Sequence, residues 1–319
     1  MGKCIILDYQ RSANGYIGTD MAVKIYPKNN WHENFSKAEQ EESIVALETG
    51  QILFFPSLSF VIEEEEKIFL SPHYANPKTK NISFNAQVNR VRGAQVNAEE
   101  YTLLRNMLNR YATYSSHLIT ALFPQYSHAI LQGRTSFRPV EISNRTTSYR
   151  KDDTRLHIDA FPATPNQGQR LLRVFCNVNP FGQARIWRVG EPFEQVARRF
   201  LPKINKPLPM IASLLHLLKL TKSLRSDYDH IMLQIHNQMK YDLDYQREAT
   251  QSEINFFPGS SWIVQTDQVS HAAMAGQFLL EQTFYLPVHA MRDPTQAPLK
   301  VLERLTGRQL VHNLTEQVS

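Results

Sequence analysis

Residues 152–180 have the sequence DDTRLHIDAFPATPNQGQRLLRVFCNVNP, which combines a candidate metal-binding pair with a strongly alternating strand. His157 and Asp159 lie two residues apart, so both side chains leave the same face of an extended strand. One imidazole and one carboxylate are part of the two-histidine, one-carboxylate triad that holds Fe(II) and leaves coordination positions open. With 11 His in 319 residues and a similar number of Asp, about 0.4 His-x-Asp matches are expected by chance. The pair alone is therefore a weak signal, and a hydrogen-bonded surface couple is the alternative.

A third ligand is expected on a later strand of the same barrel, and His271 fits this expectation. It lies in residues 258–277, PGSSWIVQTDQVSHAAMAGQ, whose pattern predicts a strand, a turn and a strand. A jelly roll brings such separated strands face to face. We therefore predict a metal site formed by His157, Asp159 and His271. Zinc and iron both accept this ligand set, so the ligands alone do not decide the metal.

The strand that follows His157 separates its side chains into two faces. Alternation places Leu172, Val174, Cys176 and Val178 on an apolar face, and Arg173, Phe175, Asn177 and Asn179 on the other. The apolar face suits packing beneath helices, so Arg173 is expected to line the barrel. A buried guanidinium needs an anion, and a carboxylate is its best match. Iron with a bound dicarboxylate indicates a 2-oxoglutarate oxygenase. The alternative is that Arg173 pairs with Asp or Glu of its own fold.

Outward from this stretch, the sequence predicts one domain of the α+β class over residues 1–319. Short alternating runs predict a double-stranded β-helix (a jelly roll, cupin-like) over residues 136–290, with helices around it and a helical insertion at about 208–246. Residues 1–135 form a mixed N-terminal part that flanks this core. Within it, helices are expected at 39–47, ended by Gly50, and at 97–122. Residues 291–319 are expected to form a helical tail that packs on the core or on another subunit of a homo-oligomer.

Composition excludes several classes of protein. A chain with 42% hydrophobic and 20% charged residues is neither disordered nor an integral membrane protein. Two cysteines are too few for a disulfide framework, and the N-terminus lacks a signal-peptide pattern, so we expect a cytoplasmic protein. A net charge of +5 favours anionic partners. No helix-turn-helix, zinc-finger or RNP-like stretch accompanies this charge, so nucleic acid is not an expected partner.

The apolar first half of the insertion, about residues 208–220, is too short and too interrupted to span a bilayer. A buried helix is one interpretation. The other is an interfacial helix in peripheral contact with an anionic membrane.

Several motifs closely resemble the Kdo hydroxylase family, and together they cover most of residues 42–287. These motifs are SFRPVEISNR (136–145), RKDDTRLHIDAFPATPNQGQRLLRVFCNVNP (150–180), ARIWRVGEPFE (184–194), ALETGQILFFPSLSF (46–60), KNISFN (80–85) and SHAAMAGQFLLEQTF (270–284). The resemblance implies an Fe(II)- and 2-oxoglutarate-dependent dioxygenase. Such an enzyme uses O2 to hydroxylate the sugar acid Kdo at C3 in the inner core of lipopolysaccharide.

Carried over to this sequence, the resemblance implies His157, Asp159 and His271 as iron ligands. It implies Arg173, with Arg138, as the residues that hold 2-oxoglutarate. In many such oxygenases an Arg about ten residues after the distal His holds this cosubstrate, but no Arg occurs here between His271 and Arg292. The cationic anchor must therefore come from another strand.

The expected substrate is Kdo-containing lipid A, which is anionic and lipid-linked. Arg145, Arg150, Lys151 and Arg155 precede or flank the metal strand, while Arg185 and Arg188 flank Trp187, so that arginine and an aromatic ring could cradle a sugar acid. A lipid-linked substrate also favours contact with the cytoplasmic face of the inner membrane. Two alternatives stay open: a 2-oxoglutarate oxygenase acting on another substrate, and a non-catalytic cupin-like sugar-binding module that holds a metal.

Overall fold

The computed structural model describes residues 22–77, 79, 81–143, 147–205, 217–221 and 223–311. Its strands are β1 (Val23–Ile25), β2 (Ile52–Phe55), β3 (Ile82–Asn85), β4 (Arg90–Arg92), β5 (Leu131–Arg138), β6 (Arg170–Asn177), β7 (Arg185–Val189), β8 (Ser252–Phe256), β9 (Ser261–Gln265), β10 (His271–Ala275) and β11 (Leu279–Leu286). Its longer helices are α1 (Lys37–Glu48), α2 (Ala98–Leu122), α3 (Phe193–Phe200), α5 (Asp227–Tyr241), α6 (Leu243–Glu248) and α7 (Pro298–Thr306).

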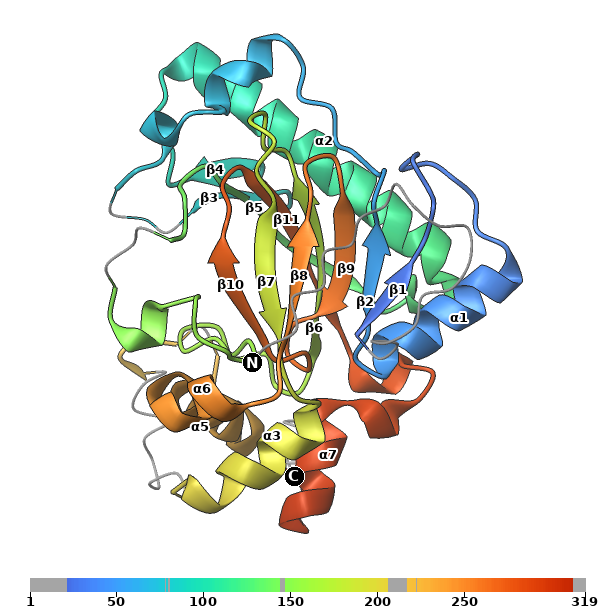
Figure 1. Cartoon of the computed structure of the whole chain (residues 1–319), viewed down its shortest axis with the longest axis vertical. Coiled ribbons are helices and arrows are strands. Elements are labelled where there is room, and N and C mark those ends of the chain that lie inside the picture. Colours follow the sequence, from blue (N-terminus) through green and yellow to red (C-terminus); the bar gives the residue numbers. More distant parts are fainter. Residues whose placement is uncertain are drawn as a thin grey trace.

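The strands form two facing sheets with the topology of a jelly roll, as predicted (Figure 1). The larger sheet has the order β1-β2-β9-β6-β11-β5-β3-β4, and the smaller sheet has the order β10-β7-β8. Large apolar side chains from both sheets fill the space between them, among them Phe175, Trp187, Phe256 and Trp262. The rings of Phe256 and Trp262 are stacked with their centroids 3.9 Å apart.

The two faces of β6 are those that alternation predicts. Leu172, Val174 and Cys176 belong to the apolar cluster beneath α1 and α2, whereas Phe175 lies in the cluster between the sheets. Because Arg173 and Asn177 share the parity of Phe175, they also face the interior. The position predicted for Arg173 is therefore confirmed.

Two helices cover the outer face of the large sheet (Figure 1). Each begins with a capping box, formed by Ser36 and Glu39 in α1 and by Asn97 and Glu100 in α2. In each box, the side chain of each residue accepts a hydrogen bond from the backbone amide of the other. α1 ends before Gly50, which has a φ of 89° that favours glycine. Tyr111 of α2 donates a hydrogen bond to the carbonyl of Val174 (3.0 Å), which fixes the helix to the sheet.

The other helices gather at one end of the barrel (Figure 1). A second apolar cluster there joins α3, α5 and α7 to the strand segment around His157, through residues such as Leu156, Phe200, Met239 and Leu302. α7 forms part of the predicted C-terminal tail, and it packs on the core. The end of that tail, residues 312–319, lies outside the described residues.

One boundary differs from the sequence prediction. The division at 135/136 falls inside β5, and β1–β4 extend the large sheet, because ILFF at residues 52–55 pairs with β9 rather than flanking the core. In the insertion expected at 208–246, α5 and α6 are helical. Its Leu-rich first part, residues 206–216, lies outside the described residues.

Candidate metal centre

The predicted ligands converge on one point at the edge of the smaller sheet. One nitrogen of each imidazole of His157 and His271 and one carboxylate oxygen of Asp159 all lie within 4.8 Å of one another. Nε2 of His157 is 3.8 Å from Oδ1 of Asp159. Both histidines are 5% exposed, so a bound ion would be largely shielded from bulk water.

The backbone fixes both histidines before any metal binds. His157 and His271 form an isolated antiparallel bridge, in which each amide donates to the other's carbonyl (2.9 and 2.8 Å). Nδ1–H of His157 donates to the carbonyl of Arg155 (2.7 Å), and Nδ1–H of His271 donates to the carbonyl of Val269 (2.8 Å). With Nδ1 protonated on both rings, the two Nε2 lone pairs are left for a metal.

The protonation states suit a divalent cation. Burial lowers the pKa of His157 well below its ordinary value, and the nearby ammonium of Lys240 lowers it further. Burial also lowers the pKa of His271. For Asp159, burial alone would raise the pKa, but the guanidinium of Arg173 holds it below its ordinary value. Both imidazoles are therefore neutral and the carboxylate is ionised at neutral pH, as metal ligands must be.

The carboxylate of Asp159 completes the set of possible ligands. Its buried Oδ2 lies 3.1 Å from Nη2 of Arg173 without a well-aligned hydrogen bond, and its Oδ1 lies 3.8 Å from Nε2 of His157. Together with the two free Nε2 atoms this carboxylate supplies a facial set of two imidazoles and one carboxylate, which is the donor set of non-haem Fe(II) oxygenases. The residues present therefore fit the predicted metal.

Charged side chains continue from the ligands into the interior. Arg173 contacts Asp159 (Nη2 to Oδ2, 3.1 Å) and Glu281 of β11 (Nη1 to Oε1, 2.9 Å). Glu281 also pairs with Arg138 of β5, and Nη1 of Arg138 lies 3.9 Å from Oδ2 of Asp153. Arg173 thus pairs with carboxylates of its own fold here, as the alternative interpretation expected.

Glu281 is a site residue that sequence reasoning missed. Its side chain is 4% exposed and lies between two guanidinium groups. The sequence did contain one indication of this role. Glu281 is the single acidic residue in LLEQTFYL, and it lies two residues after Leu279, so alternation places both side chains on the interior face of the strand. It lies ten residues after His271, where the cosubstrate Arg of a 2-oxoglutarate oxygenase was sought in the sequence, and it carries the opposite charge.

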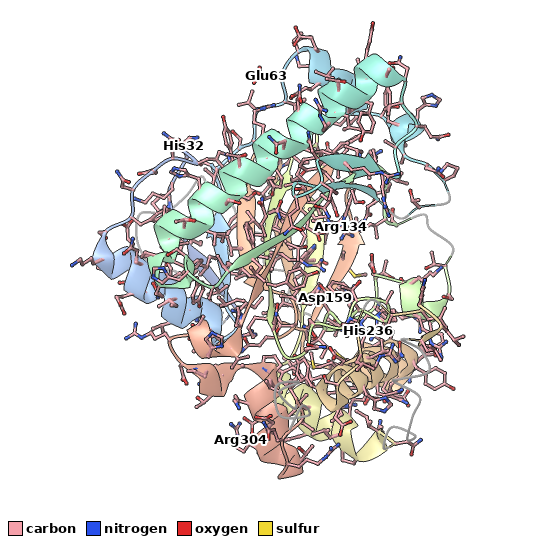
Figure 2. All side chains as sticks on the ribbon, turned by 180° about the vertical axis from the view of Figure 1, so that it is seen from behind. His32, Glu63, Arg134, Asp159, His236 and Arg304 are labelled. Carbon is pink, nitrogen blue, oxygen red and sulfur yellow. The ribbon has the colours of Figure 1, made fainter. Side chains whose placement is uncertain are left out.

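Aromatic rings enclose the ligands. Trp187 of β7 stacks on His271, with centroids 4.9 Å apart and an interplanar angle of 20°. His236 of α5 contacts His157 edge-on at 5.2 Å and donates from Nδ1 to the carbonyl of Ile158 (2.7 Å). Figure 2 shows His236 and Asp159 close together where α5 meets the barrel. These contacts restrict the rotation of both imidazole rings.

The arginines expected to bind substrate have different environments. Arg150 is exposed and lies over the ring of Tyr149 (5.3 Å), close to the metal strand. Arg155 is held by Asp152 (3.1 Å) and by the carbonyl of Lys240 (2.7 Å), which indicates a structural role. Arg145 lies outside the described residues.

Arg188 does not face the metal centre. β7 pairs Arg188 with Ala272 and Trp187 with Ala273, so the side chains of Arg188 and Trp187 leave opposite faces of the strand. Arg188 therefore cannot form the expected cradle with Trp187, because neighbouring strand residues leave opposite faces. Arg185 does share the inner face with Trp187.

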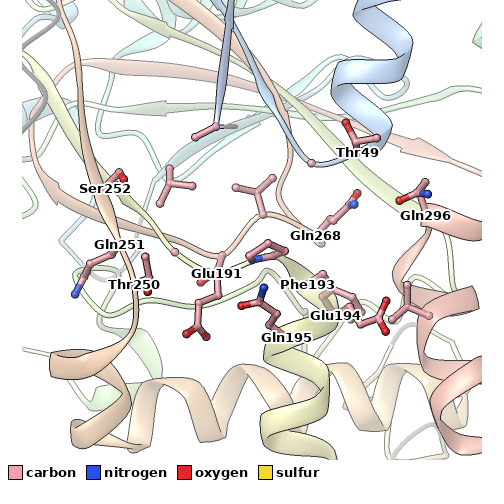
Figure 3. A pocket seen from close by; sticks show the side chains of 18 of the residues that line it. Thr49, Glu191, Phe193, Glu194, Gln195, Thr250, Gln251, Ser252, Gln268 and Gln296 are labelled. Carbon is pink, nitrogen blue, oxygen red and sulfur yellow. The ribbon is translucent and has the colours of Figure 1, made fainter. Parts of the chain in front are cut away.

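A separate cavity of about 730 Å³ lies between the barrel end and α3 (Figure 3). Glutamines and hydroxyl residues line much of it, including Gln195, Gln251, Gln268 and Ser252. Val269 and Ser270 line it directly before His271, but none of the three ligands is among the described lining residues. The cavity is therefore distinct from the metal centre.

Comparison with known proteins adds a family and close structural relatives. A family model described as 3-deoxy-D-manno-oct-2-ulosonic acid (Kdo) hydroxylase matches residues 30–309. A crystal structure of the Kdo hydroxylase KdoO, a non-haem Fe(II) α-ketoglutarate-dependent dioxygenase, in complex with α-ketoglutarate and Fe(III) is 45% identical, with a TM-score of 0.89 over 91% of this chain and 97% of that chain. The cobalt(II) complex gives 45% identity and a TM-score of 0.90 over 91% and 98% of the two chains. No curated protein matches the chain.

Proposed function

Because this chain belongs to the Kdo hydroxylase family, we propose that it hydroxylates Kdo at C3 in the inner core of lipopolysaccharide. It is an Fe(II)- and 2-oxoglutarate-dependent dioxygenase, and O2 is the oxidant. The observation that supports the site assignment is the buried convergence of His157, Asp159 and His271, in which both Nδ1 atoms are bonded to backbone carbonyls and the two Nε2 atoms are left for a metal. Bound iron supplies the oxygen activation that 2-oxoglutarate decarboxylation drives.

The protein's own residues have three tasks in this proposal. His157, Asp159 and His271 hold the iron, and the carbonyls of Arg155 and Val269 fix the tautomers of the two imidazoles. Trp187 and His236 hold the ring planes and exclude water from one side of the site. Arg173 and Arg138 supply positive charge for 2-oxoglutarate. The Nε atoms of both arginines are buried and donate no hydrogen bond, so each keeps one donor for a ligand.

For the lipid-linked substrate we propose the exposed surface around Arg150 and Tyr149. Tyr149 packs against Tyr241 (centroids 5.5 Å apart), which is 65% exposed, so aromatic rings and a guanidinium lie together beside the metal strand. Such a surface suits an anionic sugar. Arg145 remains a further candidate on sequence grounds.

We also propose peripheral contact with the cytoplasmic face of the inner membrane. None of the helices that the described residues form combines the length and apolar character needed to cross a bilayer. Leu217, Leu218 and Leu220 are 78%, 58% and 60% exposed, and Lys219 lies among them. Exposed leucines beside a cation are typical of a segment that lies on an anionic membrane surface.

A vesicle sedimentation assay tests this contact. We expect the triple variant Leu217→Ser, Leu218→Ser, Leu220→Ser to bind anionic vesicles less than the wild-type protein. The control is Val88→Ser, which also replaces an exposed apolar side chain by Ser but lies on the turn between β3 and β4. Equal binding by all three proteins would refute the membrane proposal.

The first test of the activity is aerobic incubation with Fe(II), 2-oxoglutarate and Kdo-containing lipid A, followed by mass spectrometry. We expect a gain of one oxygen that requires all three components and is lost in His157→Ala. Iron binding with slow, uncoupled succinate release would instead favour another substrate. Metal binding without any succinate would favour the non-catalytic sugar-binding module.

A further inference from the structure

The turn between β9 and β10, residues 266–270, contacts two of the three metal ligands. The carbonyl of Thr266 accepts from the amide of Asp159 (2.8 Å), and the carbonyl of Val269 accepts from Nδ1 of His271 (2.8 Å). His271 follows the turn directly as the first residue of β10. The position of this turn therefore helps to set the spacing between the carboxylate and the imidazoles of the site.

Packing alone does not fix the turn. All of its residues are buried, but Gln268, Val269 and Ser270 also line the cavity of about 730 Å³ (Figure 3). A side chain that borders a cavity lacks packing partners on that side. Polar contacts from other elements are therefore needed to hold the turn in one position.

Arg170, at the start of β6, supplies such contacts. Its Nε donates to Oδ2 of Asp267 (2.7 Å), and its Nη2 donates to Oε1 of Gln268 (2.6 Å). The side chains of Arg170 and Asp267 are both fully buried. Because Arg170 shares the parity of Leu172, it points to the helix-covered face of β6, away from the interior of the barrel. Arg170 thus holds the turn from outside the metal centre.

The same contacts connect the turn to the helical layer. Nε2 of Gln268 donates to the carbonyl of Glu48 (3.1 Å), the last residue of α1. The carboxylate of Glu48 accepts in turn from the hydroxyl of Tyr126 and from amides of the segment after β11. Both ends of the Gln268 amide are occupied, so this side chain is held in one orientation.

Stability alone does not account for the buried ion pair of Arg170 and Asp267. Desolvation of two charges offsets most of their attraction, and apolar residues of similar volume are often as stable or more stable at such positions. Apolar residues lack direction, however, whereas a guanidinium fork fixes the positions of the two oxygens that it binds. The forked contact with Asp267 and Gln268 is therefore suited to fixing the turn.

We propose that Arg170 is a positioning residue for the metal centre. Through Asp267 and Gln268 it fixes the turn, and through the turn it fixes the distance between the ligand carboxylate and the imidazole that follows the turn. The hydrogen bonds of its side chain go to Asp267, Gln268 and Met291, none of which is a metal ligand. The inference rests on the metal site of the proposed function.

The test separates positioning from stability by removing both charges at once. Arg170→Met alone leaves Asp267 buried without its partner and should be much less stable in urea. The double variant Arg170→Met, Asp267→Leu has no unpaired charge, so its urea midpoint should equal or exceed that of the wild type. We expect the double variant to bind Co(II), a redox-stable probe of the iron site, about 10-fold more weakly by calorimetry, which is the lower end of the effect of residues that orient metal ligands. Its Co(II) absorption spectrum should also differ, because the ligand geometry has changed.

Two further variants complete the test. Arg170→Lys keeps the charge but loses the fork that spans two acceptors, so the folded variant should show a smaller loss of Co(II) affinity. Arg110→Met is the control, because it breaks the ion pair between α2 and Glu66 and should lower stability at a distance from the turn. Arg110→Met should therefore bind Co(II) with the affinity and spectrum of the wild type.

Several results would overturn the proposal. Wild-type Co(II) affinity and spectrum in the double variant would show that the ion pair serves the fold alone. An equal loss of affinity in Arg110→Met would show that lower stability, and not the turn, weakens metal binding. A wild-type protein that bound no Co(II) would refute the metal site itself. The proposed hydroxylation can fail separately: the variants would rank as expected in Co(II) binding, but the wild type would add no oxygen to Kdo.

Discussion

Replacing Glu281 by Gln should destabilise the protein strongly, because this carboxylate neutralises two buried guanidiniums at once. Its oxygens contact Nη1 of Arg173 (2.9 Å) and Nη2 of Arg138, and its side chain is 4% exposed. Breaking a buried ion pair by removing one partner costs about 3–5 kcal/mol. Arg173 retains Asp159 at 3.1 Å, but the nearest other carboxylate of Arg138 is Asp153 at 3.9 Å. We therefore place the loss within this range.

Urea unfolding followed by tryptophan fluorescence measures the change, because Trp187 and Trp262 are buried between the sheets. Asp244→Asn is the matched control, since its pair with Arg247 is largely exposed and should contribute less than about 1 kcal/mol. If Glu281→Gln lowered the free energy of unfolding by less than about 1 kcal/mol, the reasoning would be refuted, because the buried ion pairs would then contribute no more than an exposed one.

The same variant predicts a pH dependence. Burial alone would raise the pKa of Glu281, but Arg138 and Arg173 lower it below its ordinary value. A carboxyl with a lowered folded-state pKa stabilises the protein above its unfolded-state pKa, and that contribution is lost as the pH falls through the folded-state value. The stability difference between wild type and Glu281→Gln should therefore be full at neutral pH and shrink in acid. A difference that grows in acid would contradict this electrostatic account.

Three further predictions concern the metal and the packing. His271→Ala should lose stoichiometric iron in a colorimetric assay while keeping its circular dichroism spectrum, and retained iron would contradict the ligand assignment. Burial raises the pKa of the Cys176 thiol to about 11. The folded Cys4→Ser variant, in which Cys176 is the remaining cysteine, should therefore not react with a thiol reagent at pH 8. A rapid reaction would mean that β6 is accessible to the reagent. Glu48 accepts from the hydroxyl of Tyr126 (2.6 Å) and from the amides of the segment after β11 (2.8 and 2.7 Å). Glu48→Gln should cost about 1–3 kcal/mol in urea unfolding because an amide nitrogen cannot accept, whereas an unchanged midpoint would show that these bonds are dispensable.

The sequence predicted the parts of this site that depend on strand periodicity. Alternation alone placed Arg173 inside the barrel and Cys176 beneath the helices, because a buried strand allows only one register. The spacing of His157 and Asp159 placed both on one face for the same reason. These are local rules that need no knowledge of the partner strands.

Periodicity could not identify which residues meet across the barrel. Glu281 and Asp159 both contact the guanidinium of Arg173 although they are far apart in the chain. Arg138 reaches the carboxylate of Glu281 only because the strand order is β6-β11-β5. Of the two arginines that flank Trp187 in the sequence, Arg185 shares its face of β7 and Arg188 does not, because side chains alternate along a strand. The strands of residues 22–92 were assigned to a flank because their pairing with β9 and β5 is non-local.

The reciprocal bridge between His157 and His271 also makes the metal centre measurable without a metal. Each of these two amides is hydrogen-bonded only while the strands that contain the histidines lie side by side. Separation of the strands would expose both amides to solvent and move both imidazoles at the same moment. Hydrogen–deuterium exchange at these two positions therefore reports how often the apoprotein opens its ligand set, and protection gained on adding Fe(II) would measure the free energy with which the ion holds the barrel closed.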